Sequence, residues 1–319
     1  MDYVLLIAGL CLLLLGANVL VDSSVAIAKK AHLSNFIIGF TIIGMGTSSP
    51  ELFISISSAL NGSGDMALGN VIGSNICNTL LILGTTATIL PFAIERQQTR
   101  RDIPFAIFAS LIMAFMASDR LFFDSENSIS RLDGMVLLGI FVAYTTYVLI
   151  KSKGSSEETG AEETTRYDKI NVFLLIAIAI AALSALLMGG NMFLDSAKSL
   201  ARTWGMSESV ISITIVAVGT SLPELITCVV AAMRGNAQLA LGNVLGSNIF
   251  NILMILGIAA TVKPLYIEGI MPADLVVLIA SAAMCYIVVF TFGKRRFDRI
   301  EGIIFLLLFV AYNVSLLLR

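Results

Sequence analysis

The chain has 319 residues, of which 57% are hydrophobic and 13% are charged, and its formal net charge is −2. Its mean hydropathy of +0.91 lies far from that of a soluble globular domain and predicts an all-α membrane protein. The near-neutral charge excludes the basic surface of a nucleic-acid-binding protein.

Ten apolar segments follow one another along the chain, most of them near the roughly 17–25 residues with which a helix crosses a bilayer. We predict spanning helices over residues 3–21, 35–60, 65–90, 103–118, 134–150, 170–190, 207–233, 238–261, 273–292 and 301–318. No basic residue precedes the first segment and no convincing cleavage site follows it, so we interpret it as a retained helix and not as a signal peptide.

Two pairs of stretches are near copies of one another. The first copy reads GTSSPELFISISSAL and ALGNVIGSNICNTLLILG, and the second reads GTSLPELITCVVAAM and ALGNVLGSNIFNILMILG. Glu51 and Glu224 are 173 positions apart, and so are Asn78 and Asn251. The chain is therefore a duplicated unit.

The duplication predicts two five-helix repeats, over residues 1–150 and 170–319. Residues 151–169 between them are rich in Ser, Thr, Gly and Glu and predict a solvated cytoplasmic linker. Because five is an odd number of crossings, the second repeat must enter the membrane from the opposite side. Inverted repeats of this kind form substrate sites near the midplane from broken helices.

Positive charges predict the orientation in the membrane. The loops after odd-numbered spans hold fourteen Lys and Arg residues, against six on the other side. By the positive-inside rule the odd loops are cytoplasmic. We expect a multi-pass protein embedded in the lipid bilayer of the plasma (bacterial inner) membrane, with both termini on the extracytoplasmic side.

A proline interrupts one span in each copy. Pro50 has no N–H, its ring clashes with the carbonyl of Gly46, and it disfavours the α conformation at Ser49. Pro223 acts on Gly219 in the same way. We expect each span to break there, freeing backbone carbonyls over 44–47 and 217–220, whose partial negative charge suits a cation.

Glu51 and Glu224 lie inside these apolar spans, where an ionisable side chain costs about 2.5–3.5 kcal/mol. No Lys or Arg lies within the motif spans to pair with them, so we interpret the pair as a functional site. Hydroxyl and amide side chains surround both positions in the sequence: Thr47, Ser48, Ser74 and Asn78 in the first copy, and Thr220, Ser221, Ser247 and Asn251 in the second.

These ligands are all oxygens, which hard cations such as Ca²⁺ and Na⁺ prefer and Zn²⁺ or Cu²⁺ do not. Two carboxylates neutralise one Ca²⁺, and the same oxygens in smaller sets can hold several Na⁺. Interhelical hydrogen bonds would also explain the asparagines, and close packing would explain the glycines of the motifs.

The motif pair resembles the paired signature repeats of the Ca²⁺/cation antiporter superfamily, particularly those of the prokaryotic sodium/calcium exchangers. The resemblance covers almost the whole chain. It implies an exchanger, not an enzyme, without a cofactor, in which the first and sixth spans slide against the other eight while three Na⁺ exchange for one Ca²⁺.

The resemblance also implies roles for individual residues. Glu51 and Glu224 would coordinate Ca²⁺ together with the carbonyls of Thr47 and Thr220. The groups expected to serve Na⁺ are Ser48, Ser74, Ser221, Ser247 and the carbonyls of Gly44 and Ala217. Some members carry Asp where this chain has Asn78 or Asn251, and Asn at both positions argues against dependence on potassium.

Three other functions remain open on the residues alone. A Ca²⁺/H⁺ antiporter would protonate Glu51 and Glu224 when Ca²⁺ leaves. An intramembrane aspartyl protease would use the GxGD sequence that ends at Asp65 and the aspartate of the Tyr167–Asp168 pair, although the second copy has Gln238 in place of Asp65. A passive cation channel is the third.

Overall fold

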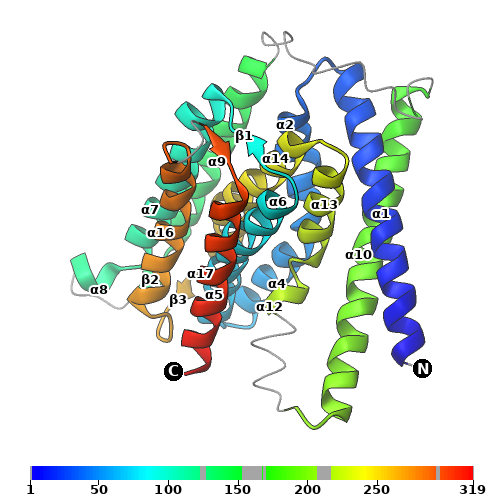
Figure 1. Ribbon diagram of the computed structural model, residues 1–319. Coiled ribbons are helices and arrows are strands. Elements are labelled where there is room, and N and C mark those ends of the chain that lie inside the picture. Colours follow the sequence, from blue (N-terminus) through cyan, green and yellow to red (C-terminus); the bar gives the residue numbers. More distant parts are fainter. Residues whose placement is uncertain are drawn as a thin grey trace.

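The computed structural model describes residues 2–122, 127–152, 167, 170–206, 217–291 and 295–318. Within this part the chain forms a bundle of helices with two short antiparallel strand pairs (Figure 1). The predicted linker lies mostly outside the described residues, as does the first part of the predicted seventh span. Segments with π-helical hydrogen bonding carry the symbol η.

The first half of the chain contains several helices that follow one another without a loop. Its elements are α1 (Asp2–Lys30), α2 (Asn35–Ile38), η1 (Gly39–Ile43), α3 (Gly44–Thr47), α4 (Ser49–Leu60), α5 (Gly64–Ile76), η2 (Cys77–Leu83), α6 (Gly84–Ile89), β1 (Phe92–Ala93), η3 (Gln98–Asp102), α7 (Ile103–Met116), α8 (Asp119–Phe122), β2 (Ser128–Ile129) and α9 (Arg131–Ser152).

The second half repeats much of this order. Its elements are α10 (Val172–Thr203), α12 (Ala217–Gly219), α13 (Leu222–Met233), α14 (Ala237–Ile249), η5 (Phe250–Ile255), α15 (Leu256–Val262), β3 (Leu265–Tyr266), α16 (Pro272–Val288), β4 (Arg296–Phe297) and α17 (Arg299–Leu317). The π-helical segments η2 and η5 begin 173 positions apart, at Cys77 and Phe250.

The prediction of a helical membrane protein is confirmed. Six helical segments of the described chain are long and apolar enough to cross a membrane, and a bent pair, Asn35–Thr47 with Ser49–Leu60, makes a seventh. The apolar helices α13 and α16, with 12 and 17 residues, are shorter than these six segments. The number of ten spans stays a prediction. α1 and α10, with 29 and 32 residues, are longer than the spans predicted for them.

α1 and α10 lie side by side at one edge of the bundle (Figure 1). Glycines bring the two backbones together: a Cβ on Gly16 would lie 2.6 Å from the backbone nitrogen of Leu186, and one on Gly189 would lie 2.5 Å from that of Leu13. Gly16 and Gly189 are again 173 positions apart. Both copies therefore use glycine for the same close contact.

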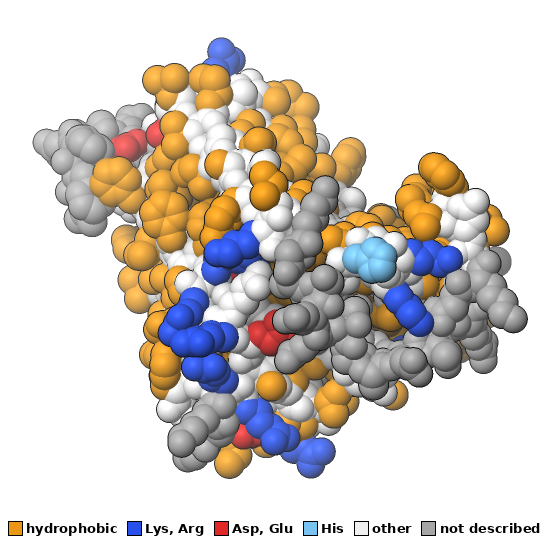
Figure 2. Space-filling view, turned by 90° about the horizontal axis from the view of Figure 1, so that it is seen from above, with side chains coloured by type: hydrophobic (Ala, Val, Ile, Leu, Met, Phe, Trp, Pro, Cys, Tyr) orange, Lys and Arg blue, Asp and Glu red, His pale blue; other side chains and the backbone are white. Residues whose placement is uncertain are grey.

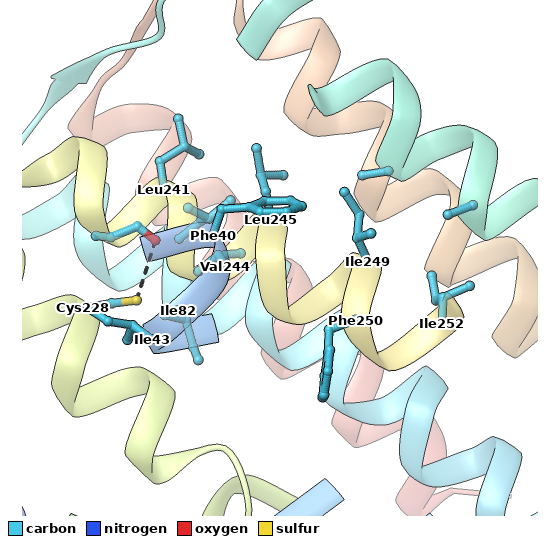
Figure 3. Packing of buried hydrophobic residues seen from close by; sticks show 14 of the residues in the cluster. Phe40, Ile43, Ile82, Cys228, Leu241, Val244, Leu245, Ile249, Phe250 and Ile252 are labelled. Atoms are coloured by element: carbon cyan, nitrogen blue, oxygen red, sulfur yellow. Dashed lines mark hydrogen bonds between the residues drawn. The ribbon is translucent and has the colours of Figure 1, made fainter. Parts of the chain in front are cut away.

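The centre of the bundle is formed where α14 packs on α2, η1 and α3 of the first half. A Cβ on Gly246 would lie 2.3 Å from the carbonyl oxygen of Phe40, so a larger residue does not fit there without a backbone shift. Figure 3 shows Phe40 and Ile43 of η1 among the side chains of Val244 and Leu245 of α14. This contact places the first broken span against the second copy of the motif.

The two strand pairs lie toward opposite ends of the bundle (Figure 1). β1 pairs with β4 through Phe92 and Phe297, and β3 pairs with β2 through Leu265 and Ile129. β1 and β3 are themselves 173 positions apart. Matched segments of the two copies thus make matched contacts at opposite ends of the molecule.

One end face of the bundle is rich in positive charge. It is the face at which α1 ends with Lys29 and Lys30, uppermost in Figure 1, and Figure 2 shows several groups of Lys and Arg side chains on it. Hydrophobic side chains surround these groups (Figure 2). The two termini lie at the opposite end (Figure 1).

Candidate cation site

The predicted breaks occur in both copies, each one residue before the expected position. Ser48 (φ −79°, ψ 12°) separates α3 from α4, and the two helical parts of this span meet at 47°. Ser221 (φ −90°, ψ 9°) precedes α13 in the same way. The expectation that Ser49 leaves the helix is wrong, because Ser49 begins α4 and Pro50 lies in its first turn, where no N–H is needed.

Part of the backbone freed by the break is satisfied within the chain. The carbonyl of Gly46, which would have bonded to an N–H at position 50, accepts a hydrogen bond from Ser49 Oγ at 2.7 Å. The carbonyl of Gly44, expected to be free, keeps its helical hydrogen bond from the N–H of Ser48 at 3.3 Å and accepts a second one from Ser247 Oγ of α14 at 3.1 Å. The second copy has Leu222 in place of Ser49 and has no hydroxyl at this position.

The break places each carboxylate at the beginning of a helix. Glu51 lies in the first turn of α4 and Glu224 in the first turn of α13, and each is 1% exposed. The positive end of a helix dipole stabilises negative charge at this position.

Side chains from the two copies meet at these breaks. Ser48 Oγ donates a hydrogen bond to Glu224 Oε1 at 3.0 Å. The one O–H of Thr47 lies between two acceptors, the carbonyl of Ile43 at 2.9 Å and Asn243 Oδ1 of α14 at 3.3 Å from Oγ1. The first broken span is therefore tied to the second copy through its predicted site residues.

Four asparagines join the helices that follow the breaks. Asn78 Nδ2 donates to Asn248 Oδ1 at 3.1 Å, and Asn251 Nδ2 donates to Asn75 Oδ1 at 3.1 Å. Asn251 Nδ2 also donates to Ser74 Oγ at 3.1 Å. The interhelical hydrogen bonds that were one explanation of Asn78 and Asn251 are present, but they occupy only the NH₂ end of each side chain.

Several buried oxygens of this region have no hydrogen-bond partner. Among the described residues, the buried side-chain atoms without a partner are Glu51 Oε1 and Oε2, Glu224 Oε2, Ser221 Oγ, Asn78 Oδ1, Asn251 Oδ1, Ser24 Oγ and Thr145 Oγ1. All but the last two belong to predicted ligands. Buried polar groups are normally hydrogen-bonded, and a bound cation would satisfy unpaired oxygens of this kind.

The remaining predicted residues lie around this group. Ser74 Oγ donates to the carbonyl of Asn70 at 2.8 Å, Thr220 is half-buried immediately before Ser221, and Ala217 begins α12. In the described part of the chain, no three His, Cys, Asp or Glu side chains cluster as a metal site. The negative charge of the candidate site thus comes from the two glutamates.

Sequence reasoning missed the asparagines that hold this region together: Asn70, Asn75, Asn243 and Asn248. Asn70 Nδ2 donates to Ser55 Oγ at 2.9 Å, and Asn243 Nδ2 donates to Cys228 Sγ at 3.2 Å, so these two also make matched contacts. Asn70 and Asn243, like Asn75 and Asn248, are 173 positions apart, and this repetition was the signal in the sequence that could have identified them. Their contacts could not be inferred from it.

Asp65, the aspartate of the GxGD sequence, has a structural partner. Its Oδ1 accepts hydrogen bonds from the backbone N–H groups of Glu268 and Gly269, at 3.1 and 3.0 Å. It therefore holds the loop between β3 and α16. The second aspartate of the protease hypothesis, Asp168, lies outside the described residues.

These features define a helical membrane protein whose candidate cation site consists of buried oxygens from two copies of one motif. The chain belongs to the sodium/calcium exchanger family: the sequence model described as "Sodium/calcium exchanger protein" matches residues 1–150 and 174–318. The predicted membership of the Ca²⁺/cation antiporter superfamily is confirmed. The protein is a cation antiporter and not an enzyme, and exchange requires no cofactor.

Several relatives match over nearly the full chain. The sodium/calcium exchanger MaX1 of Methanosarcina acetivorans is 29% identical over 99% of this chain and 98% of its own length. The inner membrane protein YrbG of Escherichia coli is 33% identical over 82% of this chain and 79% of its own. A structure of the sodium-calcium exchanger NCX_Mj is 30% identical, covers 99% of this chain and 98% of its own, and has a TM-score of 0.84.

Proposed function

We propose that the protein exchanges Ca²⁺ for Na⁺ by alternating access, at one site shared by both repeats near the membrane midplane. The observation that carries this proposal is the set of unpartnered buried oxygens on Glu51, Glu224, Ser221, Asn78 and Asn251. They come from both copies, and each belongs to a residue expected to bind an ion. A cation lowers the cost of burying them, because it replaces the lost contacts with water.

Ca²⁺ and Na⁺ would compete for overlapping ligands. Ca²⁺ would take the carboxylates of Glu51 and Glu224 with the carbonyls of Thr47 and Thr220, which neutralises its charge. Na⁺ ions would use smaller groups of the remaining oxygens: the hydroxyls of Ser48, Ser74, Ser221 and Ser247 and the carbonyls of Gly44 and Ala217. With three Na⁺ for one Ca²⁺, one net charge moves, and 100 mV contributes about 2.3 kcal/mol to each cycle.

We propose the predicted ten spans and inverted repeats as the architecture behind this exchange. The matched breaks at Ser48 and Ser221 support it, as do the matched strand pairs at opposite ends and the position of both termini at one end. The basic end face supports a cytoplasmic orientation for that end and extracytoplasmic termini, in a plasma or bacterial inner membrane.

Within this architecture, α1 and α10 would slide as a pair against the remaining helices. They pack along each other through glycines that allow contact between backbones. Their sliding would expose the site to one side of the membrane and then to the other. The protein would change between these two conformations with ions bound at the site.

The test uses the purified protein in sealed vesicles with ⁴⁵Ca²⁺ outside. We expect an outward Na⁺ gradient to drive Ca²⁺ uptake, and a pH gradient without Na⁺ to drive none. Uptake driven by the pH gradient alone would instead identify a Ca²⁺/H⁺ antiporter. Conductance without gradient-driven accumulation would identify a channel and overturn exchange altogether.

Glu51→Gln and Glu224→Gln should each lower Ca²⁺ uptake by about 100-fold or more, since removing one charged partner of a buried ion costs roughly 3–5 kcal/mol. Glu268→Gln is the matched control, because Glu268 is exposed in the loop between β3 and α16. Normal Na⁺-driven exchange in either site variant would mean that the two carboxylates do not bind the transported ions.

A further inference from the structure

The four asparagines between the copies divide into two kinds. In Asn75 and Asn248 the Oδ1 atom accepts a hydrogen bond from another side-chain amide. In Asn78 and Asn251 the Nδ2 atom donates and the Oδ1 atom has no partner. All four are buried. The side-chain atoms without a partner in this group are thus both amide oxygens, those of Asn78 and Asn251.

This arrangement has a chemical consequence at a cation site. An asparagine amide presents an acceptor oxygen at one end and two N–H donors at the other. Only the oxygen end can bind a cation, and rotating the amide by half a turn would present N–H groups of positive partial charge. A neutral amide is thus a useful ligand only if something fixes which end faces the ion.

Asn75 and Asn248 are themselves held in place. Asn75 Nδ2 donates to the backbone carbonyl of Asn248 at 3.2 Å, and Asn248 Nδ2 donates to Thr79 Oγ1 at 2.9 Å. Rotating the Asn75 amide would lose both its donor and its acceptor contact, and rotating that of Asn248 would place its NH₂ group against the NH₂ group of Asn78. Each of these residues therefore keeps a fixed oxygen opposite the NH₂ group of an asparagine in the other copy.

We propose that Asn75 and Asn248 are positioning residues, which turn the amide oxygens of Asn251 and Asn78 toward the transported cation. Each acts across the interface between the copies, so that the ligand of one repeat is oriented by the other repeat. This inference rests on the proposed function, because it takes the unpartnered oxygens to be cation ligands. It assigns no direct contact with the ion to Asn75 or Asn248.

The first test is Asn75→Leu, which removes the acceptor opposite Asn251 and keeps a side chain of similar size. We expect the apparent affinity for Ca²⁺ in Na⁺-driven uptake to fall by about 10–100-fold, the usual effect of removing a group that orients a metal ligand. The maximal uptake rate should change much less, because the carboxylates and the helices stay in place. Asn248→Leu should act in the same way through Asn78.

The decisive test combines Asn75→Leu with Asn251→Asp. A carboxylate has an oxygen at both ends, so it needs no partner to select the end that faces the ion. In the Asn251→Asp background, adding Asn75→Leu should therefore change the Ca²⁺ affinity by no more than about twofold, the ordinary scatter of independent sites. A residue that only supports packing would cost the same in both backgrounds.

Two results would overturn the inference while leaving the proposed function intact. One is wild-type Ca²⁺ affinity in Asn75→Leu, and the other is an equal loss with and without Asn251→Asp. Absence of Na⁺-driven uptake in the wild type would instead overturn the proposed function. If Asn75→Leu does not give a monodisperse protein, Asn75→Ala, which introduces no clash, replaces it in the same pair of measurements.

Discussion

In the first copy of the motif Asn75 donates to the backbone carbonyl of Asn248, whereas in the second copy Asn248 donates to the hydroxyl of Thr79. The position equivalent to Thr79 is Ile252, which has no acceptor. Two contacts across the interface are reciprocal, from Asn78 to Asn248 and from Asn251 to Asn75. Other contacts differ even at shared residues: Asn251 also donates to Ser74 Oγ at 3.1 Å, whereas the equivalent Ser247 donates to the carbonyl of Gly44.

The carboxylates also differ between the copies, although a serine lies three residues before each of them. Glu224 accepts a hydrogen bond from Ser48 and has one free oxygen, whereas both oxygens of Glu51 are free. The serine equivalent to Ser48 is Ser221, and its hydroxyl has no partner among the described residues. Duplicated ligands therefore do not imply equal roles, and substitutions at equivalent positions can separate them.

The largest effect should come from breaking the contact between the copies. In Gly246→Ala the new methyl group would lie 2.3 Å from the carbonyl oxygen of Phe40. That atom belongs to the backbone and cannot turn aside, so we expect a loss of at least about 3 kcal/mol, the upper end of the usual cost of overpacking. Thermal unfolding in detergent should show a clearly lower midpoint.

Gly139→Ala is the control for that substitution. Gly139 is exposed on α9, and no described residue lies within 4 Å of a Cβ placed there. Alanine also favours a helix over glycine, so its midpoint should be unchanged or slightly raised. Equal midpoints for the two variants would show that α14 and η1 are not in close contact in the folded protein.

A smaller effect should separate Ser48 from Ser221. Both are predicted Na⁺ ligands, so both alanine variants should weaken the dependence of uptake on Na⁺. Only Ser48→Ala also removes the hydrogen bond that holds Glu224, and hydrogen bonds to charged groups contribute roughly 1.5–3 kcal/mol. We expect its Ca²⁺ affinity to fall by about tenfold, since about 1.4 kcal/mol corresponds to a factor of ten.

The matched variant Ser221→Ala should keep Ca²⁺ affinity close to that of the wild type. Ca²⁺ titrations of Na⁺-driven uptake measure both variants under the same conditions. An equal loss of Ca²⁺ affinity in the two would contradict the difference between the carboxylates, and would mean that the two copies act alike on Ca²⁺.

The residues of the candidate site could be picked out from the sequence because they are duplicated. A shared spacing identified Glu51 and Glu224, the prolines located the breaks, and the oxygens indicated a hard cation. The break was misplaced by one residue because Pro50 is compatible with the first turn of the new helix at Ser49. Local rules for proline predicted an interruption but not its exact conformation.

The contacts between the copies could not be predicted in the same way. The asparagine pairs join residues about 170 positions apart, and the spacing of a repeat does not say which faces of the two helices meet. The π-helical segments η2 and η5 also lack a sequence signature of their own. They are typical of functional sites in helices, which agrees with their position at the asparagines.

The smallest expected effect concerns an ion pair that only one copy possesses. Arg234, at the end of α13, forms an ion pair with Asp22 of α1 and donates to Asn18 Oδ1 at 2.7 Å. The equivalent of Arg234 in the first copy is Asn61, and the equivalent of Asp22 is Asp195. Asp195 pairs with Lys198 of its own helix at 3.4 Å. α1 is thus tied by charge to α13, and this tie is not duplicated.

Arg234→Gln should loosen α1 at its basic end, and faster amide hydrogen exchange in residues 19–30 would measure this. The pair is partly exposed, so its loss should cost at most about 1 kcal/mol, which corresponds to roughly a fivefold change in exchange. Lys198→Gln removes the same charge from a pair within one helix and should leave α1 unchanged. Equal protection of α1 in both variants would show that Arg234 does not restrain it. Faster exchange only in Arg234→Gln would mean that the two copies hold α1 and α10 with different strength, although their motifs are nearly the same.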